Sequence, residues 1–92
     1  MDLDELFSCR GRIKILLVLF EHGEMSMSEL ARRSGLNYTT TEKHVEVLAR
    51  KGLVKERRWG RARLVSLNME KPETRLITFF FEKWASGGLQ EG

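Results

Sequence analysis

Side chains that both donate and accept hydrogen bonds gather at the start of one predicted helix, in the stretch Tyr38-Thr39-Thr40-Thr41. Lys43 and His44 follow within the next turn. Each threonine is less favourable than alanine in a helix by up to about 0.7 kcal/mol, so three together suggest a second role. A threonine hydroxyl can bond to a DNA base edge, and its methyl can touch the thymine methyl. The segment is therefore a candidate surface for contacting bases in the DNA major groove.

The helical period predicts which of these side chains face outward. The outward set on the first two turns is Tyr38, Thr39, Thr40, Lys43 and His44. The inward set is Thr41, Val45, Leu48 and Ala49. Asn37 is the expected N-cap, and we include it in the candidate DNA-binding surface. The acidic Glu42 and Glu46 must face away from phosphates or pair with Lys43, Arg50 or Arg32.

Two other interpretations of this helix stay open. Thr39 and Glu42 have the spacing of a capping box. In this interpretation Thr39 and Thr40 cap the start of the helix and contact no base. His44 can equally be a solvated surface residue with no contact to a base.

A second basic cluster lies in the sequence ERRWGRAR, residues 56–63. Residues 31–67 hold ten Lys and Arg against three Asp and Glu, although the whole chain has a net charge of only +3. This asymmetry favours a polyanionic partner over an ordinary solvated face. Trp59 either packs on a sugar or folds back on the domain. The arginines expected to bind phosphates or the minor groove are Arg32, Arg33, Arg57, Arg58, Arg61 and Arg63.

Periodicity and end signals place these residues on a short series of elements. A first helix covers residues 3–22, with an apolar stripe of Ile13, Leu16, Leu17 and Phe20. A second covers 27–34, with Ser26 as N-cap in the capping-box pattern with Glu29. The third covers 38–51. A hairpin follows, with strands at 53–58 and 61–67 and a turn at Trp59-Gly60. A last helix begins near Pro72 and ends at Gly87-Gly88.

The last helix carries an unusual density of aromatic side chains. Its predicted stripe is Leu76, Ile77, Phe80, Phe81 and Trp84, and Phe79 lies off that stripe. The position of Phe79 suggests that this helix is buried on a second side, and this predicts a homodimer. A monomer with the helix in its core is the alternative that stays open. The predicted dimer interface is Leu3, Leu6, Phe7, Leu76, Ile77, Phe79, Phe80, Phe81 and Trp84.

Length and composition exclude several classes of protein. A chain of 92 residues forms one domain, and 41% hydrophobic residues fit a globular fold. The single Cys9 allows no internal disulfide and suggests a reducing compartment. No apolar run reaches the length of a membrane span. We therefore expect a cytoplasmic protein without a membrane segment, metal or cofactor, and the residues contain no recognisable enzyme site.

Residues 11–68 resemble the winged-helix regulators of the ArsR and MarR type. The resemblance is carried by Arg12 to Leu16 in an R-x-x-I-L spacing, the S-x-x-E-L-A helix, the ending L-x-x-x-G-L-V and a charged hairpin, the wing. It implies an α+β fold, a winged helix-turn-helix made of a three-helix core and a β-hairpin wing, with an added C-terminal helix. Some metal-sensing members carry a C-x-C pair near the recognition helix, and this chain lacks it.

The resemblance and the residues together give one expected organisation. Residues 1–70 are expected to form a winged-helix DNA-binding domain, 71–87 a dimerisation helix and 88–92 a flexible tail. The expected function is a sequence-specific regulator of transcription that binds double-stranded DNA as a dimeric repressor. The alternative is a winged-helix module of the transcription machinery that binds other proteins.

Overall fold

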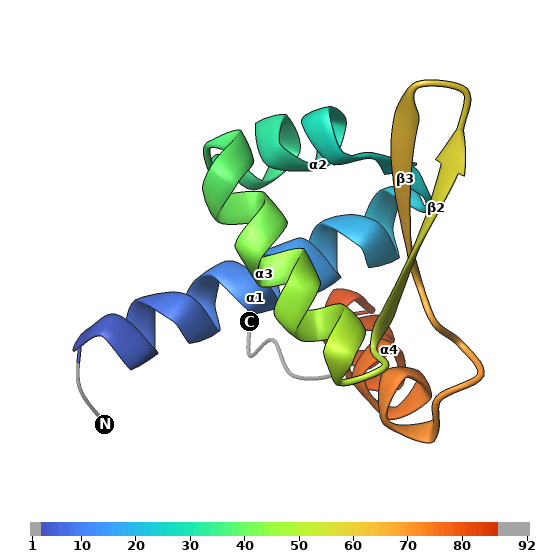
Figure 1. The fold of residues 1–92 in the computed structure, drawn as a ribbon. Helices are drawn as coiled ribbons and strands as arrows, with labels where there is room; N and C mark the ends of the chain where they lie inside the picture. Colours follow the sequence, from blue (N-terminus) through green and yellow to red (C-terminus); the bar gives the residue numbers. More distant parts are fainter. Residues whose placement is uncertain (1–2, 87–92) are drawn as a thin grey trace.

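The computed structural model describes residues 3–86, with side-chain surroundings from Cys9 onward. The elements are α1 (Leu3–His22), β1 (Met25–Ser26), α2 (Met27–Ser34), α3 (Tyr38–Arg50), β2 (Val54–Trp59), β3 (Ala62–Leu67) and α4 (Pro72–Ala85). Figure 1 shows α1, α2 and α3 packed together, with the β2–β3 hairpin beside them and α4 below. This arrangement is the predicted α+β winged helix with an added C-terminal helix.

The core forms where α1, α2, α3 and the sheet meet. Its most buried apolar side chains include Ile15, Leu19, Met27, Leu30, Val45 and Val65. The predicted apolar stripe of α1 is confirmed only in part: Leu16 is buried and Leu17 and Phe20 are half-buried, but Ile13 is exposed. The neighbouring Ile15, Val18 and Leu19, which we expected at the flanks of the stripe, are the more deeply buried side chains. Apolar residues fill nearly every position from 13 to 20, so the pattern alone does not fix which side of this helix faces the core.

The sheet has three antiparallel strands in the order β1-β3-β2. The two-residue β1 was not predicted from the sequence, and its Met25 pairs with Val65. In the hairpin Arg58 lies opposite Arg63 and Trp59 opposite Ala62. The predicted turn is displaced by one residue, because Trp59 belongs to β2 and Gly60 takes a left-handed φ of 61° after it.

Side-chain caps fix where α2 and α3 begin. The Ser26 hydroxyl accepts a hydrogen bond from Glu29 N at 3.2 Å, which confirms it as the N-cap of α2. Asn37 Oδ1 accepts one from Thr40 N at 2.8 Å, so Asn37 caps α3 as predicted. The capping box proposed for Thr39 is therefore wrong, since Thr39 already lies inside the helix.

Three of the four residues of α3 that we expect to face inward are buried, and the fourth is exposed. Thr41, Val45 and Leu48 are buried as predicted, and Thr41 Oγ1 donates to Asn37 O at 2.9 Å. Ala49, which we expected to face inward, is exposed because it lies on the side of α3 that looks toward the wing.

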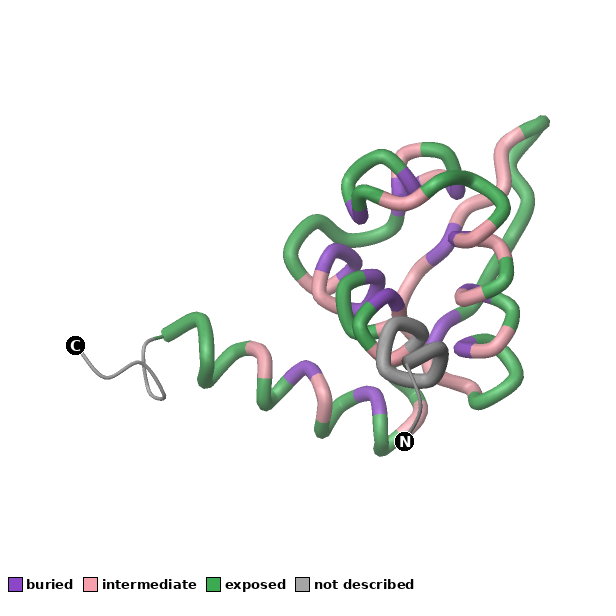
Figure 2. The backbone as a smooth tube through the Cα atoms, turned by 90° about the vertical axis from the view of Figure 1, so that its left-hand side faces the viewer, coloured by how far each residue is buried: buried purple, intermediate pink, exposed green. Residues whose placement is uncertain are grey.

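Only one side of helix α4 packs against the core of the domain. Ile77 and Phe81 are half-buried against the core, and the Phe81 ring lies 5.6 Å from that of Phe20 between centroids. Thr74 and Thr78 are the buried residues of this helix, in place of the predicted aromatic stripe. Figure 2 shows α4 extending away from the rest of the chain with mostly exposed residues.

Several aromatic and aliphatic side chains of α4 are consequently left in solvent. Their exposed fractions are 70% for Leu76, 56% for Phe79, 51% for Phe80 and 51% for Trp84. The other predicted interface residues, Leu3, Leu6 and Phe7, have side chains outside the described part of the structure, as does the predicted helix end at Gly87-Gly88. None of the described helices is both long and apolar enough to cross a membrane.

Candidate nucleic-acid interface

Three edges of α3 have different surroundings. The outermost edge carries Thr39, Lys43, Glu46 and Arg50, which are exposed. The edge that looks toward α1 carries Thr40, His44 and Val47, which are half-buried. Glu42 lies on the side that looks toward the wing. Side chains that a DNA duplex can reach directly are therefore those of the outermost edge, together with the exposed Tyr38 at the beginning of the helix.

The structure corrects the outward assignment of His44. Its ring lies against the backbone of Gly11 in α1, so closely that a Cβ on Gly11 would stand 2.6 Å from His44 Nε2. Partial burial, and then the positive charge of Arg12, lower the pKa of His44 from its ordinary value. Glycine at position 11 thus allows α1 and the side chain of His44 to approach each other. Thr40 shares this sheltered edge.

Arg63 of the wing is not free to bind phosphate, because two carboxylates already accept hydrogen bonds from it. Its Nε donates to Glu56 Oε2 at 2.6 Å, and its Nη1 donates to Glu42 of α3. These hydrogen bonds, first from Glu56 and then from Glu42, raise the pKa of Arg63 above its ordinary value. Arg63 therefore joins the wing to α3, and Glu42 is paired with a residue that the sequence had not suggested for it.

Arg57 is also paired, on the other face of the hairpin. Its Nε and Nη2 each donate to a carboxylate oxygen of Glu24 at 2.9 Å, and the Arg57 hydrogen bond lowers the pKa of Glu24. Its guanidinium lies 5.7 Å from the centroid of Trp59. Trp59 does not fold back into the core, since 70% of its surface is exposed.

Two arginines of the wing remain available. Within residues 9–86, neither Arg58 nor Arg61 forms an ion pair, and both are exposed. Arg61 and Tyr38 line the same cavity of about 370 Å³, between the start of α2 and the hairpin tip. The tip of the wing and the beginning of α3 are therefore neighbours in space, although 23 positions separate Tyr38 from Arg61 in the sequence.

Arg32 and Arg33 face outward on α2, as predicted, but both contact Glu29. Arg32 Nη2 and Arg33 Nε lie 2.5 and 2.6 Å from Glu29 Oε2. Their hydrogen bonds lower the pKa of Glu29, Arg32 contributing first. The Glu29 carboxylate thus pairs with both arginines. A DNA phosphate would have to compete with Glu29 in order to bind Arg32 or Arg33.

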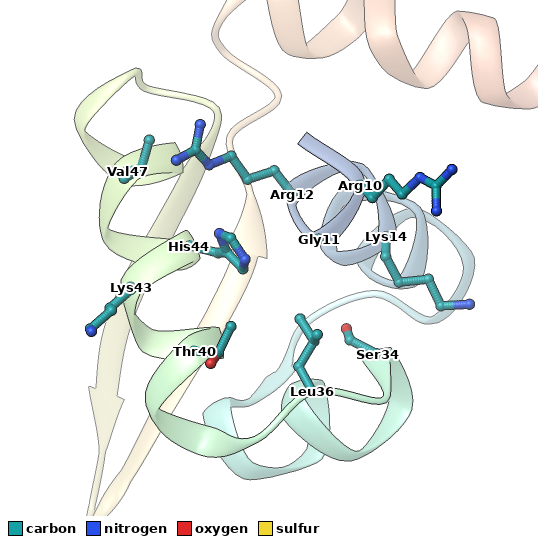
Figure 3. A pocket seen from close by; sticks show the side chains of 10 residues that line it. All are labelled: Arg10, Gly11, Arg12, Lys14, Ser34, Leu36, Thr40, Lys43, His44 and Val47. Carbon is teal, nitrogen blue, oxygen red and sulfur yellow. The ribbon is translucent and has the colours of Figure 1, made fainter. Parts of the chain in front are cut away.

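Sequence reasoning missed a basic group on the first helix. Arg10, Arg12 and Lys14 line a groove with the α1-facing edge of α3, on the opposite side of α3 from the wing. Figure 3 shows Arg12 and His44 between the two helices, with Lys43 at the outer margin. Acidic residues outnumber basic ones in residues 1–30, so the charge balance of this part of the sequence conceals the group. An alternating R-G-R-I-K on one helix was the available signal.

Other chemistry has little support among the described side chains. Cys9 is a free, half-buried thiol. No group of three or more His, Cys, Asp or Glu that could hold a metal ion occurs in the part of the chain that was searched.

Comparison with known proteins agrees with this geometry. A family model described as winged helix-turn-helix DNA-binding matches residues 12–55. The sequence has no match among the curated proteins that were compared.

Solved structures with the same fold include transcriptional regulators. The chain is 25% identical to the homodimeric winged helix-turn-helix DNA-binding domain of a candidate ArsR-family regulator from Mycobacterium bovis, covering 87% of this chain and 71% of that one with a TM-score of 0.70. It is 25% identical to the transcriptional repressor BigR from Xylella fastidiosa, covering 88% and 78% with a TM-score of 0.72.

A third structure shares the fold at lower identity. The MarR family transcriptional regulator SPO1453 from Silicibacter pomeroyi is 20% identical, covering 85% of this chain and 54% of that one with a TM-score of 0.67. The present chain thus spans about half of that regulator. Taken with the capped α2–α3 pair and the basic hairpin, these matches show that the chain has a winged helix-turn-helix fold and is similar to regulators of the ArsR and MarR families.

Proposed function

We propose that this protein is a sequence-specific transcriptional regulator that binds double-stranded DNA as a homodimer and represses by occupying promoter DNA. The observation that carries the proposal is the neighbourhood of Tyr38 and Arg61, which brings the start of α3 and the wing tip to one side of the molecule. An α-helix fits the major groove, and a basic hairpin beside it can follow the phosphates.

The outer edge of α3 is the proposed base-contacting surface. Thr39 and Lys43 are exposed on its first two turns, and Tyr38 stands at its beginning. A well-placed base contact is worth about 1–3 kcal/mol of discrimination. Thr40 and His44 lie toward α1 and are half-buried, so we propose for them only a supporting role at the margin of this surface. Asn37 contributes by capping the helix.

The wing and α2 are the proposed phosphate anchors. Arg58 and Arg61 need to break no ion pair with a described residue in order to reach DNA. Arg32, Arg33, Arg57 and Arg63 are held by carboxylates, so their contribution requires exchange of one anion for another. Trp59 is free to pack on a sugar at the wing tip.

The exposed apolar side of α4 supports a homodimer. Leu76, Phe79, Phe80 and Trp84 form this side, and Ile77 and Phe81 join it to the core. Burying such side chains contributes about 1.5–3 kcal/mol each. The similar domain from Mycobacterium bovis is homodimeric. A two-fold dimer sets two recognition helices about 34 Å apart and requires a pseudo-palindromic site. We accordingly treat residues 72–85 as the dimerisation helix and assign the protein no enzymatic role.

Binding to random duplex DNA at low salt tests the proposal. A fluorescently labelled duplex of 30 base pairs should bind at micromolar protein, and the logarithm of the affinity should fall linearly with that of salt concentration. Arg58→Gln and Arg61→Gln should each weaken binding to every sequence alike, whereas the distant Lys55→Gln should act only weakly. Absence of binding at micromolar protein would favour a module that binds other proteins.

A further inference from the structure

The outer part of the wing extends beyond the three-stranded part of the sheet. Strand β1 pairs with β3 at Leu64 and Val65, so the hairpin continues past that point with two strands, and we call residues 57–63 the outer hairpin. Every residue of β2 after Val54 is exposed, and Figures 1 and 2 show the hairpin tip projecting from the rest of the domain. A hairpin of two strands is marginally stable alone in water, so other contacts must determine where its tip lies.

Two arginines supply the side-chain hydrogen bonds that join the outer hairpin to described residues outside β2 and β3. Arg57 of β2 donates from Nε and Nη2 to separate oxygens of the Glu24 carboxylate, each at 2.9 Å. Arg63 of β3 donates from Nη1 to Glu42 of α3. In the ladder Arg63 stands opposite Arg58, the neighbour of Arg57, so the two pairs lie on opposite faces of the hairpin.

The Arg57–Glu24 pair crosses the sheet. Ser26, Leu64 and Arg57 stand side by side on β1, β3 and β2. Glu24 comes directly before β1, so the pair spans β3 and ties the edge strand β2 to the segment that follows α1. The same guanidinium lies 5.7 Å from the ring centroid of Trp59, within the range of a cation–π contact. A two-pronged bond between arginine and carboxylate is the geometry in which an exposed ion pair has a measurable effect.

We propose that Glu24 is a positioning residue for DNA binding, because it holds the wing tip in place through Arg57. The Arg63–Glu42 pair holds the opposite face of the hairpin in the same way. A protein that binds a polyanion thus depends on two of its own carboxylates. The consequence for DNA rests on the proposed function, in which the wing tip meets phosphates.

The charge of Glu24 allows a test in which two roles predict effects of opposite sign. If Glu24 only blocks Arg57 from DNA, removing the carboxylate frees a phosphate ligand, strengthens duplex binding and raises its salt slope by about one. If Glu24 holds the tip, Glu24→Gln weakens duplex binding, although the variant is more positive than the wild type.

The order of the wing tip in the DNA-free protein tests the positioning role directly. NMR relaxation should give lower backbone order parameters at Gly60 and Arg61 in Glu24→Gln than in wild type, toward the value of about 0.6 that marks a flexible backbone. Arg57→Lys keeps the charge but loses the two-pronged bond, so it should loosen the tip as well. Glu46→Gln is the matched control, because Glu46 is an exposed carboxylate of α3 outside both pairs, and it should leave the tip unchanged. Unchanged order parameters in the helices will show that each variant keeps its fold.

Binding to random duplex DNA tests the consequence. The double variant Glu24→Gln/Arg57→Gln removes the pair without changing the net charge. It should weaken binding about two- to fivefold at an unchanged salt slope, which is the effect of losing one partly exposed ion pair. A slope reduced by about one would show that Arg57 contacts phosphate itself. That result, or stronger binding by Glu24→Gln alone, would overturn the proposal.

The two measurements separate this inference from the proposed function. Wild-type order at the tip in Glu24→Gln and Arg57→Lys, in a protein that binds duplex DNA, would reject the positioning role and retain the regulator. A loosened tip in a protein whose wild type binds no duplex DNA would leave Glu24 as a support of the hairpin alone, and would reject both its role in DNA binding and the regulator.

Discussion

Arg63 of β3 and Glu42 of α3 form an ion pair that joins the wing to the proposed recognition helix. Glu56 completes the contact, because it accepts from Arg63 Nε at 2.6 Å. The pairing explains how an acidic residue is tolerated on a helix that we expect beside phosphates. It also joins the hairpin to α3, and so helps to position Arg58 and Arg61, the proposed phosphate anchors.

The Arg63–Glu42 pair should be detectable as a coupling energy. Both side chains are partly exposed, so the expected coupling is modest, about 0.5–1 kcal/mol. A double-mutant cycle with Arg63→Gln and Glu42→Gln, followed by urea unfolding, measures it. Arg63→Gln should also reduce the salt slope of duplex binding less than Arg61→Gln does. Equal reductions would mean that Arg63 contacts phosphate directly.

The contact of His44 with Gly11 predicts a background-dependent effect of alanine. In an ordinary helix interior, Gly→Ala stabilises by about 1 kcal/mol. Gly11→Ala should give no such gain in wild type, because the new Cβ would stand 2.6 Å from His44 Nε2 and force the ring to move. In a His44→Ala background the full gain should appear. Chemical denaturation of the four proteins checks this, and equal gains in both backgrounds would show that the two residues do not touch.

The lowered pKa of His44 predicts a dependence of stability on pH. Burial and then the charge of Arg12 disfavour the protonated ring in the folded state. The unfolded chain therefore binds a proton more readily as the pH falls below about 6.5, and this lowers the free energy of unfolding. The loss should level off once the pH is below the folded pKa. His44→Gln should remove this component when melting is followed from pH 7.5 to 5, with Arg12 and the rest of the groove unchanged.

The exposed side of α4 predicts how the proposed dimer can be broken. Phe80→Glu should raise the dimer dissociation constant at least a hundredfold, because it replaces a buried ring with a charge. Glu82→Lys, on the exposed charged side of the same helix, is the matched control and should leave the mass unchanged. Sedimentation equilibrium measures both. A dimer that survives Phe80→Glu, or a wild type that is monomeric at tens of micromolar, would contradict the proposed interface.

Helix boundaries were the most predictable part of this structure, because local side chains set them. Ser26 and Asn37 form the predicted N-caps, and Gly35 takes a left-handed φ of 71° at the end of α2. These signals act over three or four residues and so are visible in the sequence. By contrast, β1 consists of two residues that form a strand only because β3 passes beside them.

The orientation of side chains was harder to predict, because it depends on distant partners. The continuous apolar run of α1 left its buried side undetermined, and contact with α2, α3 and β3 decides it. His44 turns inward because a glycine 33 positions earlier makes room for it. Arg57 and Arg63 are held by Glu24 and Glu42, which the sequence separates by 33 and 21 positions. A sequence pattern that spans a few residues cannot predict ion pairs between residues so far apart in the chain.

Selection of bound sites from a random duplex pool tests the central claim, that the outer edge of α3 reads bases while the wing holds phosphates. The wild type should select a pseudo-palindrome with half-sites one helical turn apart. Thr39→Ala and Lys43→Ala should change the preferred bases within each half-site, whereas Arg61→Gln should weaken all sites alike and keep the same preference. Selection of no common sequence by the wild type, or of an unchanged sequence by Thr39→Ala and Lys43→Ala, would contradict base reading by this edge.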